Sequence, residues 1–297
     1  MEKLVSGAYN KVIESLVGNR TGVPFRICSI IENQEGAMHD AARFVGSDRQ
    51  VFVKAGNRPF SPDQFRQEAW SLSYLRTRTS VQAPEPLGVV EADGVSLLIM
   101  EVVPVVPPTT DAHWETLGRG LADMHHHTST QCGFETHTYL GIFRQDNRPM
   151  DSWPAFFGER RLRDTMRMAV EAGNLPTEHQ QLIERLILRL PEVCGPEQPF
   201  SLLHGDPWPG NLLHDGHRMV AIDCSLYYGN REIDLSTVDF FFPVNPRFFD
   251  AYHEVYPIDP GYASRKSLWR INQWLGHVTL FGASYLPKLE EAIRPYL

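Results

Sequence analysis

The chain has 297 residues, enough for one large domain or two modest ones, and its 42% hydrophobic and 22% charged residues are typical of a globular protein. The formal net charge of -8 disfavours nucleic-acid binding, because proteins that grip nucleic acid usually carry a basic excess. The apolar runs are too short to cross a bilayer, so no membrane partner is expected. The 4 cysteines are scattered without C-x-x-C spacing, which argues against a disulfide framework and favours a cytoplasmic location.

The first hundred residues predict a small lobe that mixes strands and helices. Apolar residues recur at helical spacing from Leu4 and end at Gly18, and later alternating segments predict strands. Asp93-Gly94 is a hairpin signal between the last two of them. The predicted elements are a helix ending at Gly18, strands over 25–31, 38–45 and 50–54, a helix from Ser61, and strands over 87–90 and 95–100.

A proline-rich connector follows this lobe, and the rest of the chain is mainly helical. Helices are predicted over 111–127, 153–172 and 177–190, followed by a strand-rich island over 200–223. The chain therefore divides into an N-terminal lobe, residues 1–102, and a C-terminal lobe, residues 103–297, with a hinge near residue 102.

The strand-rich island contains the residues with the clearest chemistry. Two strands joined by the turn at 214–217 would place Asp223 beside Asn211 and leave Asp206 projecting from the preceding loop. Phosphoryl transfer needs a carboxylate to accept the proton of the attacking hydroxyl and side-chain oxygens to hold Mg²⁺. The island therefore predicts a phosphotransferase site.

A lysine that neutralises the nucleotide phosphates should lie at the end of a strand in the other lobe. Lys54 ends the apolar segment 51–54 and is placed as such a lysine requires. Glu68, on the helix that follows, could pair with Lys54 and hold its ammonium group in position.

Three segments resemble the lysine, catalytic loop and metal-binding aspartate of the kinase-like small-molecule phosphotransferases, which include choline and aminoglycoside kinases. They are Phe52-Val53-Lys54, His204-Gly205-Asp206-x-Trp208-x-Gly210-Asn211 and Ile222-Asp223. More narrowly, a further segment resembles the fructosamine kinase family. It is Tyr227-Tyr228-Gly229-x-Arg231-Glu232-x-Asp234-Leu235.

This resemblance implies an α+β fold of the two-lobed protein-kinase-like type, with a small antiparallel sheet-plus-helix lobe and a larger mainly helical lobe. It implies ATP-dependent phosphorylation of a sugar hydroxyl on a ketosamine, a small-molecule acceptor, by a monomer or weak homodimer. Asp206 would be the general base, and Asn211 and Asp223 would bind Mg²⁺.

The resemblance also assigns the nucleotide and acceptor contacts. Lys54 and Glu68 would form the ion pair that orients the phosphates. The adenine would bond to backbone at the hinge, formed by Met100, Glu101 and Val102. Trp208 is either a wall for the sugar or part of the lobe core, and Asp234 is expected to bond to catalytic-loop backbone rather than to substrate.

The segment 31–37 departs from the glycine-rich turn that kinases of this class commonly place over the phosphates. It holds one glycine, Gly36, and two acids, Glu32 and Glu35, which would repel phosphates if they pointed inward. Some relatives carry a redox-sensitive cysteine in this turn, but Cys28 precedes it and no redox role is transferred.

The run His125-His126-His127, with His137, also invites interpretation as a metal site. Consecutive residues on a helix point in different directions, so the three cannot ligate one ion together. A solvated helix end is expected instead, and Cys132, Cys194 and Cys224 are expected to be small buried hydrophobic residues.

Two alternatives to a ketosamine kinase stay open at this stage. The acceptor could be another small hydroxyl compound, such as an aminoglycoside, an amino alcohol or a plain sugar. The acidic, glycine-poor segment 31–37 also permits a nucleotide-binding regulatory pseudokinase, against which the presence of Asp206, Asn211 and Asp223 argues.

Overall fold

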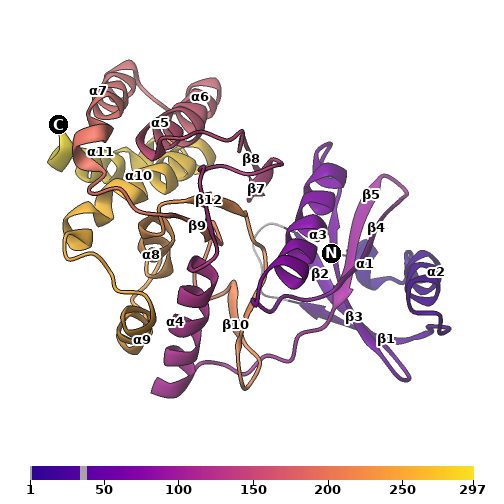
Figure 1. Ribbon diagram of the computed structural model, residues 1–297. Helices are drawn as coiled ribbons and strands as arrows, with labels where there is room; N and C mark the ends of the chain where they lie inside the picture. The colour runs from indigo at the N-terminus through magenta and orange to yellow at the C-terminus, as the bar shows by residue number, and fades with distance from the viewer. Residues whose placement is uncertain (1, 34–38) are drawn as a thin grey trace.

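An antiparallel five-stranded sheet forms the N-terminal part of the computed structural model, which describes residues 2–33 and 39–297 (Figure 1). Its strands lie in the order β1-β2-β3-β5-β4. Their bounds are Ile27–Asn33 (β1), Asp40–Gly46 (β2), Gln50–Gly56 (β3), Pro86–Ala92 (β4) and Val95–Glu101 (β5). The β4–β5 hairpin turns at Asp93 and Gly94, whose φ angles are 51° and 76°, as the sequence predicted.

Helices pack on both faces of the sheet. The side chains of β3 alternate between these two faces. Val51 and Val53 are buried in the cluster that also contains Ile13 and Val17 of the N-terminal helices. Phe52 and Lys54 point to the opposite face, because successive strand residues alternate. The helices concerned are α1 (Glu2–Val5), α2 (Asn10–Thr21) and, on the opposite face, α3 (Ser61–Arg78).

The predicted end of the first helical segment at Gly18 is wrong. Helix α2 continues through Gly18 and ends at Gly22, where φ is 70° and the backbone N–H donates to the Gly18 carbonyl over 2.9 Å. The left-handed conformation at the end of a helix suits glycine, and Gly22, not Gly18, adopts it.

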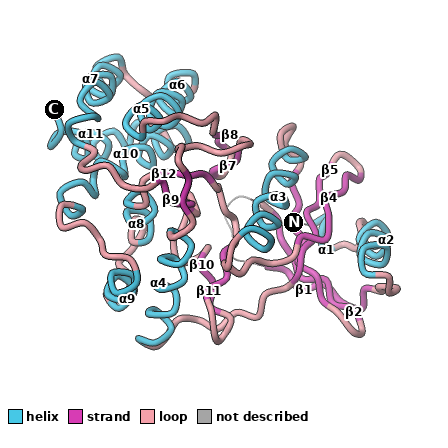
Figure 2. The backbone as a smooth tube through the Cα atoms, in the orientation of Figure 1, coloured by secondary structure: helices cyan, strands magenta, loops and turns pink. Residues whose placement is uncertain are grey.

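The C-terminal part is mainly helical, and Figure 2 shows these helices gathered away from the five-stranded sheet. The helix predicted over 153–172 is present but contains a π-helical segment at Gly158–Arg163. The α-helices are α4 (Asp111–His125), α5 (Trp153–Phe157), α6 (Asp164–Glu171), α7 (Thr177–Val193), α8 (Glu232–Val238), α9 (Arg247–Val255), α10 (Tyr262–Phe281) and α11 (Leu286–Ile293). Short 3₁₀ segments follow at Ala283–Tyr285 and Arg294–Tyr296.

Short strands between these helices support the loops of the predicted island. They form the pairs β7–β8 and β10–β11 and a three-stranded sheet in the order β12-β9-β6. Their bounds are Thr128–Ser129 (β6), Thr138–Leu140 (β7), Phe143–Gln145 (β8), Phe200–Leu203 (β9), Leu212–His214 (β10), Met219–Ala221 (β11) and Tyr227–Gly229 (β12). The two strands expected on either side of the 214–217 turn are therefore β10 and β11.

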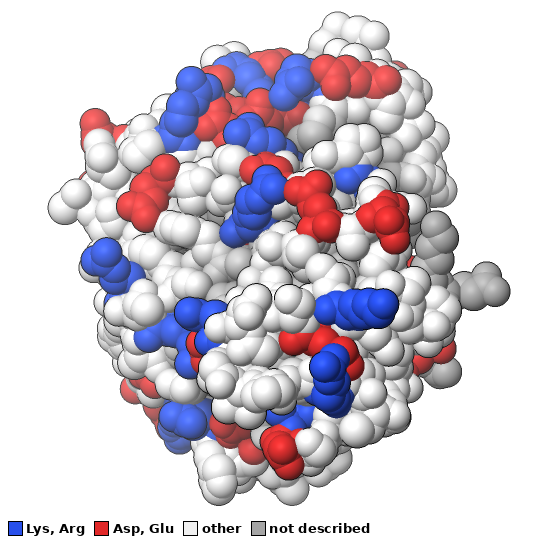
Figure 3. All heavy atoms as spheres, turned by 90° about the vertical axis from the view of Figure 1, so that its right-hand side faces the viewer, with Lys and Arg blue, Asp and Glu red and all other residues white. Residues whose placement is uncertain are grey.

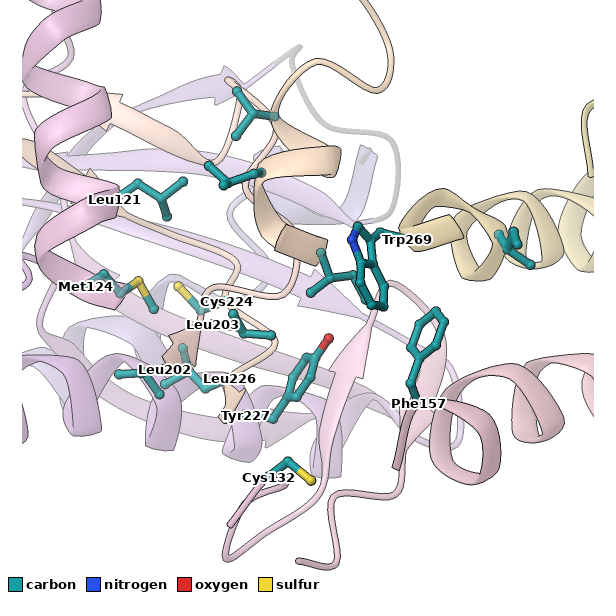
Figure 4. Close-up of a cluster of buried hydrophobic side chains, with 14 of the residues drawn as sticks. Leu121, Met124, Cys132, Phe157, Leu202, Leu203, Cys224, Leu226, Tyr227 and Trp269 are labelled. Carbon is teal, nitrogen blue, oxygen red and sulfur yellow. The ribbon is translucent and has the colours of Figure 1, made fainter. Parts of the chain in front are cut away.

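One large apolar core lies beneath the short strands. Figure 4 shows part of it, with Leu202, Leu203, Leu226, Tyr227, Phe157 and Trp269 among its members. The same core contains Phe65, Leu72 and Leu75 of α3. Helix α3 lies between strands β3 and β4 in the sequence, but its buried side chains pack in the C-terminal core. It therefore connects the N-terminal and C-terminal parts.

The surface at the sheet end of the molecule carries mixed charge. Figure 3 shows lysine and arginine side chains interspersed with aspartate and glutamate on that face. Among the helices of the described residues, none has the length and apolar character needed to span a membrane.

Candidate active site

The loop between β9 and β10 contains Asp206. Asp234 of α8 fixes the first residues of this loop. The Asp234 carboxylate accepts hydrogen bonds from the backbone N–H groups of His204, over 2.7 Å, and Gly205, over 3.0 Å. The expected contact between Asp234 and the loop backbone is thus confirmed. Gly205 has a φ of 84°, and a Cβ there would lie 2.3 Å from the Ser225 carbonyl oxygen, so this turn requires glycine.

Asn211 holds the carboxylate of Asp206 from the other end of the loop. Its Nδ2 donates to the Asp206 backbone oxygen over 3.0 Å and to Asp206 Oδ2 over 3.1 Å. The amide oxygen of Asn211 is therefore turned away from Asp206. The Ile222 N–H donates to the Asn211 carbonyl over 3.1 Å, so the β10–β11 pairing carries Asp223 to the same place.

The carboxyl group of Asp206 lies among like charges in a poorly solvated site. Burial, together with the negative charges of Asp223 and Asp234, raises the pKa of Asp206 to about 7, against the lowering effect of the Asn211 hydrogen bond. A carboxyl group with a pKa near neutrality can both accept and release a proton at physiological pH.

Lys54 reaches across from β3 to meet two carboxylates. Its Nζ lies 2.6 Å from Glu68 Oε1 on α3 and also pairs with Asp223 Oδ1. Burial by itself disfavours the ammonium form, but Asp223 and Glu68 outweigh it and raise the pKa of Lys54 above its usual value. The structure therefore brings together the lysine and glutamate that the sequence suggested as a pair, and it adds Asp223 as their neighbour.

Asp223 itself is held in an unusual backbone conformation. Its φ is 54°, a left-handed value that is uncommon for residues other than glycine. Its side chain is 41% exposed, and although burial raises its pKa, the ammonium of Lys54 outweighs this and lowers the pKa of Asp223. An ionised, partly exposed carboxylate therefore lies beside the Lys54 ammonium.

Asn211 and Asp223 each carry a side-chain oxygen of the kind that Mg²⁺ prefers. Mg²⁺ prefers hard oxygen ligands and usually takes only one or two from protein, with waters and substrate phosphates completing its shell. Among the described residues no group of three or more His, Cys, Asp or Glu is arranged to hold a metal.

Helix α3 is braced by the β7–β8 hairpin, a relationship that sequence reasoning missed. Asp63 Oδ2 lies 2.7 Å from His137 Nε2 and accepts a hydrogen bond of 2.7 Å from the Tyr139 hydroxyl. Gln64 Nε2 donates to the Gly141 carbonyl over 2.8 Å. These contacts fix the first turn of the helix that carries Glu68.

The expectation of a solvated histidine cluster is wrong for His125. Its side chain is fully buried, with Nδ1 2.7 Å from the Tyr252 hydroxyl and Nε2 3.2 Å from Asp234 Oδ2. His126 is exposed and stacks on Tyr256, with ring centroids 4.4 Å apart. His125 is the last residue of α4, and the packing of α4 on α9 encloses it.

The hinge residues border a cavity of about 610 Å³, whose lining includes Glu101, Val102 and Arg43 of β2. Met100 is buried on the face of the sheet that carries Phe52 and Lys54. The Glu101 N–H donates to the Glu85 carbonyl over 2.8 Å and is already engaged. A nucleotide base at the hinge would therefore have to use other backbone groups of this segment.

Trp208 is half-buried and lies among other aromatic rings rather than in the lobe core. Its ring meets those of Phe241 and Phe242 edge to face, with centroids 5.9 and 6.4 Å apart. Gly210 allows this position, because a Cβ there would lie 2.1 Å from the Trp208 ring. The structure therefore does not support the alternative that Trp208 is part of the lobe core.

The remaining expectations concern the segment 31–37 and the cysteines. Of the segment 31–37, residues 34–37 lie outside the described residues, including Glu35 and Gly36, whereas Glu32 is exposed on β1. Cys28 is exposed on the same strand, and the remaining cysteines are buried, as predicted. They are Cys132, Cys194 and Cys224.

Comparison with known proteins finds relatives named as ketoamine and ketosamine kinases over most of the chain. It is 30% identical to a protein of Synechocystis sp. named as a probable ketoamine kinase, over 97% of this chain and 96% of that protein. It is 28% identical to the ketosamine-3-kinase of Mus musculus, over 80% of this chain and 84% of that protein.

A solved structure from Thermobifida fusca, assigned as a fructosamine-3-kinase, superposes with a TM-score of 0.83 at 31% identity, over 96% of this chain and 98% of that chain. The expected two-lobed kinase-like fold is thereby confirmed. The family model for fructosamine kinase matches residues 9–297. As the sequence motifs predicted, the chain belongs to the fructosamine kinase family of phosphotransferases.

Proposed function

We propose that the protein transfers the γ-phosphoryl group of ATP to a sugar hydroxyl of a ketosamine. Residues 1–102 would bind the nucleotide, and residues 103–297 would supply the catalytic loop and the acceptor site. The observation that carries the proposal is the convergence of Asp206, Asn211 and Asp223, from one loop and the hairpin after it, with Lys54 from β3. The names of the relatives support the class of acceptor.

Asp206 acts as the general base in this proposal. The acceptor oxygen forms a bond to the γ-phosphorus, the bond from that phosphorus to the bridging oxygen of ADP breaks, and the hydroxyl proton passes to the Asp206 carboxylate. Asn211 holds that carboxylate through Oδ2 and so orients it. Positioning of the reactants contributes most of the rate gain, because the transition state is loose.

Nucleotide binding uses the groups around Lys54. Mg²⁺, held by Asn211 and Asp223, would neutralise charge on the triphosphate. Lys54, kept in place by Glu68, orients the phosphates, and the hinge at Met100, Glu101 and Val102 receives the adenine through its backbone. Trp208 lies two residues from Asp206 and forms a wall for the sugar.

The substitution Asp206→Asn tests the assignment of the base. Turnover is expected to fall about 10² to 10⁴-fold, while ATP affinity measured by calorimetry stays near that of the parent protein. Asp215→Asn, in the exposed turn between β10 and β11, serves as the matched control and should leave turnover unchanged. Full turnover in Asp206→Asn would remove this residue from the role.

A panel of acceptors tests the substrate class. ADP release is measured with ketosamines, simple sugars and amino alcohols side by side, and the ketosamines are expected to give the highest kcat/KM. Higher kcat/KM for another class would favour a kinase of that compound. Stabilisation by MgATP, without turnover on any acceptor, would favour a regulatory pseudokinase, since ligand at 100 times its Kd adds about 2.7 kcal/mol.

A further inference from the structure

Large apolar side chains are exposed in a group beside the catalytic loop. Phe241 and Phe242, in the segment after α8, are 54% and 50% exposed, and Leu280 and Phe281, at the end of α10, are 40% and 61% exposed. Scattered exposed apolar residues are ordinary, but a contiguous group marks a binding surface. We call Phe241, Phe242 and Phe281, with Trp208 and His277, the aromatic wall.

The aromatic wall is continuous from the catalytic loop outward. The Trp208 ring lies 5.9 Å from Phe241, the Phe241 ring lies 6.0 Å from His277, and the His277 ring lies 5.7 Å from Phe281, all between centroids. Trp208 belongs to the same loop as Asp206, so one end of the wall lies on the catalytic loop.

The wall is held from beneath by a second layer. Phe240 packs against Trp274 with centroids 4.5 Å apart, and the Arg270 guanidinium lies 5.5 Å from the Phe240 centroid. Asp239 accepts hydrogen bonds from Arg270 over 2.6 Å and from Lys266 over 2.5 Å. These two ion pairs, which leave one net positive charge, fix the layer that supports the exposed rings.

We propose that the aromatic wall binds an apolar substituent on the amine of the acceptor, an inference that rests on the proposed function. A ketosamine carries its amine on the sugar, and the amine bears a second group that must extend away from Asp206. The wall offers that group a continuous apolar path. Aromatic faces also attract the protonated amine itself, through the negative charge of their π-systems.

The chemistry of the wall selects among possible substituents. An aromatic or aliphatic group would cover Phe241 and Phe281 and release water from them, whereas a carboxylate would have to be desolvated against apolar rings. Each aromatic contact of this kind changes affinity by about 2- to 10-fold. The favoured acceptors are therefore ketosamines of apolar amines rather than of small amino acids.

Two acceptors that share one sugar test this proposal: the fructose-derived ketosamine of benzylamine and that of glycine. The benzylamine compound is expected to have a kcat/KM about 10-fold or more above that of the glycine compound. Phe241→Ala and Phe281→Ala should each reduce this ratio by about 3- to 10-fold. Leu188→Ala, which removes a 76% exposed leucine on α7, is the control and should leave the ratio unchanged.

Equal kcat/KM for the two acceptors, or a ratio that the phenylalanine variants do not alter, would overturn the proposal. Calorimetric binding of both compounds, with a non-hydrolysable ATP analogue present, separates it from the proposed function. Absence of phosphorylation of either compound would count against the function alone, whereas absence of a binding preference would count against the wall. Thermal unfolding of each variant verifies that it is folded.

Discussion

His125 Nε2 and Asp234 Oδ2 lie 3.2 Å apart in the interior, and this contact ends a chain of hydrogen bonds whose direction is fixed. The Asp234 carboxylate can only accept, so His125 Nε2 carries a hydrogen; because burial lowers the pKa of His125, the neutral ring leaves Nδ1 to accept from the Tyr252 hydroxyl. Arg231 in turn donates to the Tyr252 oxygen over 3.1 Å. Since Asp234 bonds to the backbone of the catalytic loop, this series of hydrogen bonds positions Asp206 without contacting substrate.

Removing the hydroxyl from Tyr252 should disturb this chain. In Tyr252→Phe, His125 Nδ1 and an Arg231 donor lose their buried partner, so the free energy of unfolding should fall by about 1–3 kcal/mol. Urea unfolding measures the loss. Tyr262→Phe is the control, because the buried Tyr262 hydroxyl has no partner among the described residues and its removal should cost little. Equal stability of the two variants would show that this series of hydrogen bonds does not contribute to the free energy of unfolding.

The pKa of Asp206 predicts a dependence of stability on pH. Because burial and neighbouring carboxylates raise this pKa to about 7, the folded protein keeps a proton that the unfolded chain has already lost above its usual pKa of about 3.8. Stability from this group is thus lost as pH rises from about 4 to 7. Asp206→Asn should therefore unfold with a free energy about 1–3 kcal/mol higher at pH 8, with little difference at pH 4.

Asp215→Asn should show the opposite sign. Burial raises the pKa of Asp215, but hydrogen bonds from the backbone N–H groups of His217 and Arg218 outweigh it and lower that pKa overall. Its ionised form stabilises the fold at pH 8, so the variant should be less stable there. Both are measured by urea unfolding without nucleotide or divalent cation. An Asp206→Asn protein no more stable than the parent at pH 8 would contradict the raised pKa of Asp206.

Glu68 should matter through Lys54. In Glu68→Gln the ammonium keeps Asp223 as its charged partner but loses the contact of 2.6 Å that directs it from α3. The KM for ATP should rise about 5- to 20-fold. Steady-state kinetics at saturating acceptor measures this, with Glu91→Gln as the control, because Glu91 pairs with Arg66 of the same helix at the surface. Matching KM values in the two variants would argue against a nucleotide role for the pair.

The hairpin that braces α3 should influence nucleotide binding from a distance. Tyr139→Phe removes one of the two groups that bond Asp63 Oδ2, which should weaken the anchoring of the first turn by about 0.5–1.5 kcal/mol. Faster hydrogen exchange in α3 and a 2- to 5-fold rise in the KM for ATP are expected. Unchanged exchange in residues 61–68 would show that the hairpin does not restrain the helix.

Local sequence determined the order of the elements and the central residues of the site. Asp206, Asn211 and Asp223 belong to one loop and the hairpin that follows it, so short-range spacing was enough to bring them together. Lys54 and Glu68 could be paired in advance because a strand and the next helix pack on each other. The position of Gly22 shows where local signals fail, since both Gly18 and Gly22 can end a helix.

Tertiary structure alone decided which polar groups are buried and which apolar groups are not. His125 and Asp234 are 109 residues apart, and His137 and Asp63 are 74 residues apart, so no local pattern indicates these contacts. The aromatic wall likewise joins Trp208, Phe241 and Phe281 from three segments. Burial results from the packing of the whole chain, whereas periodicity and motif spacing report only what a short segment does by itself.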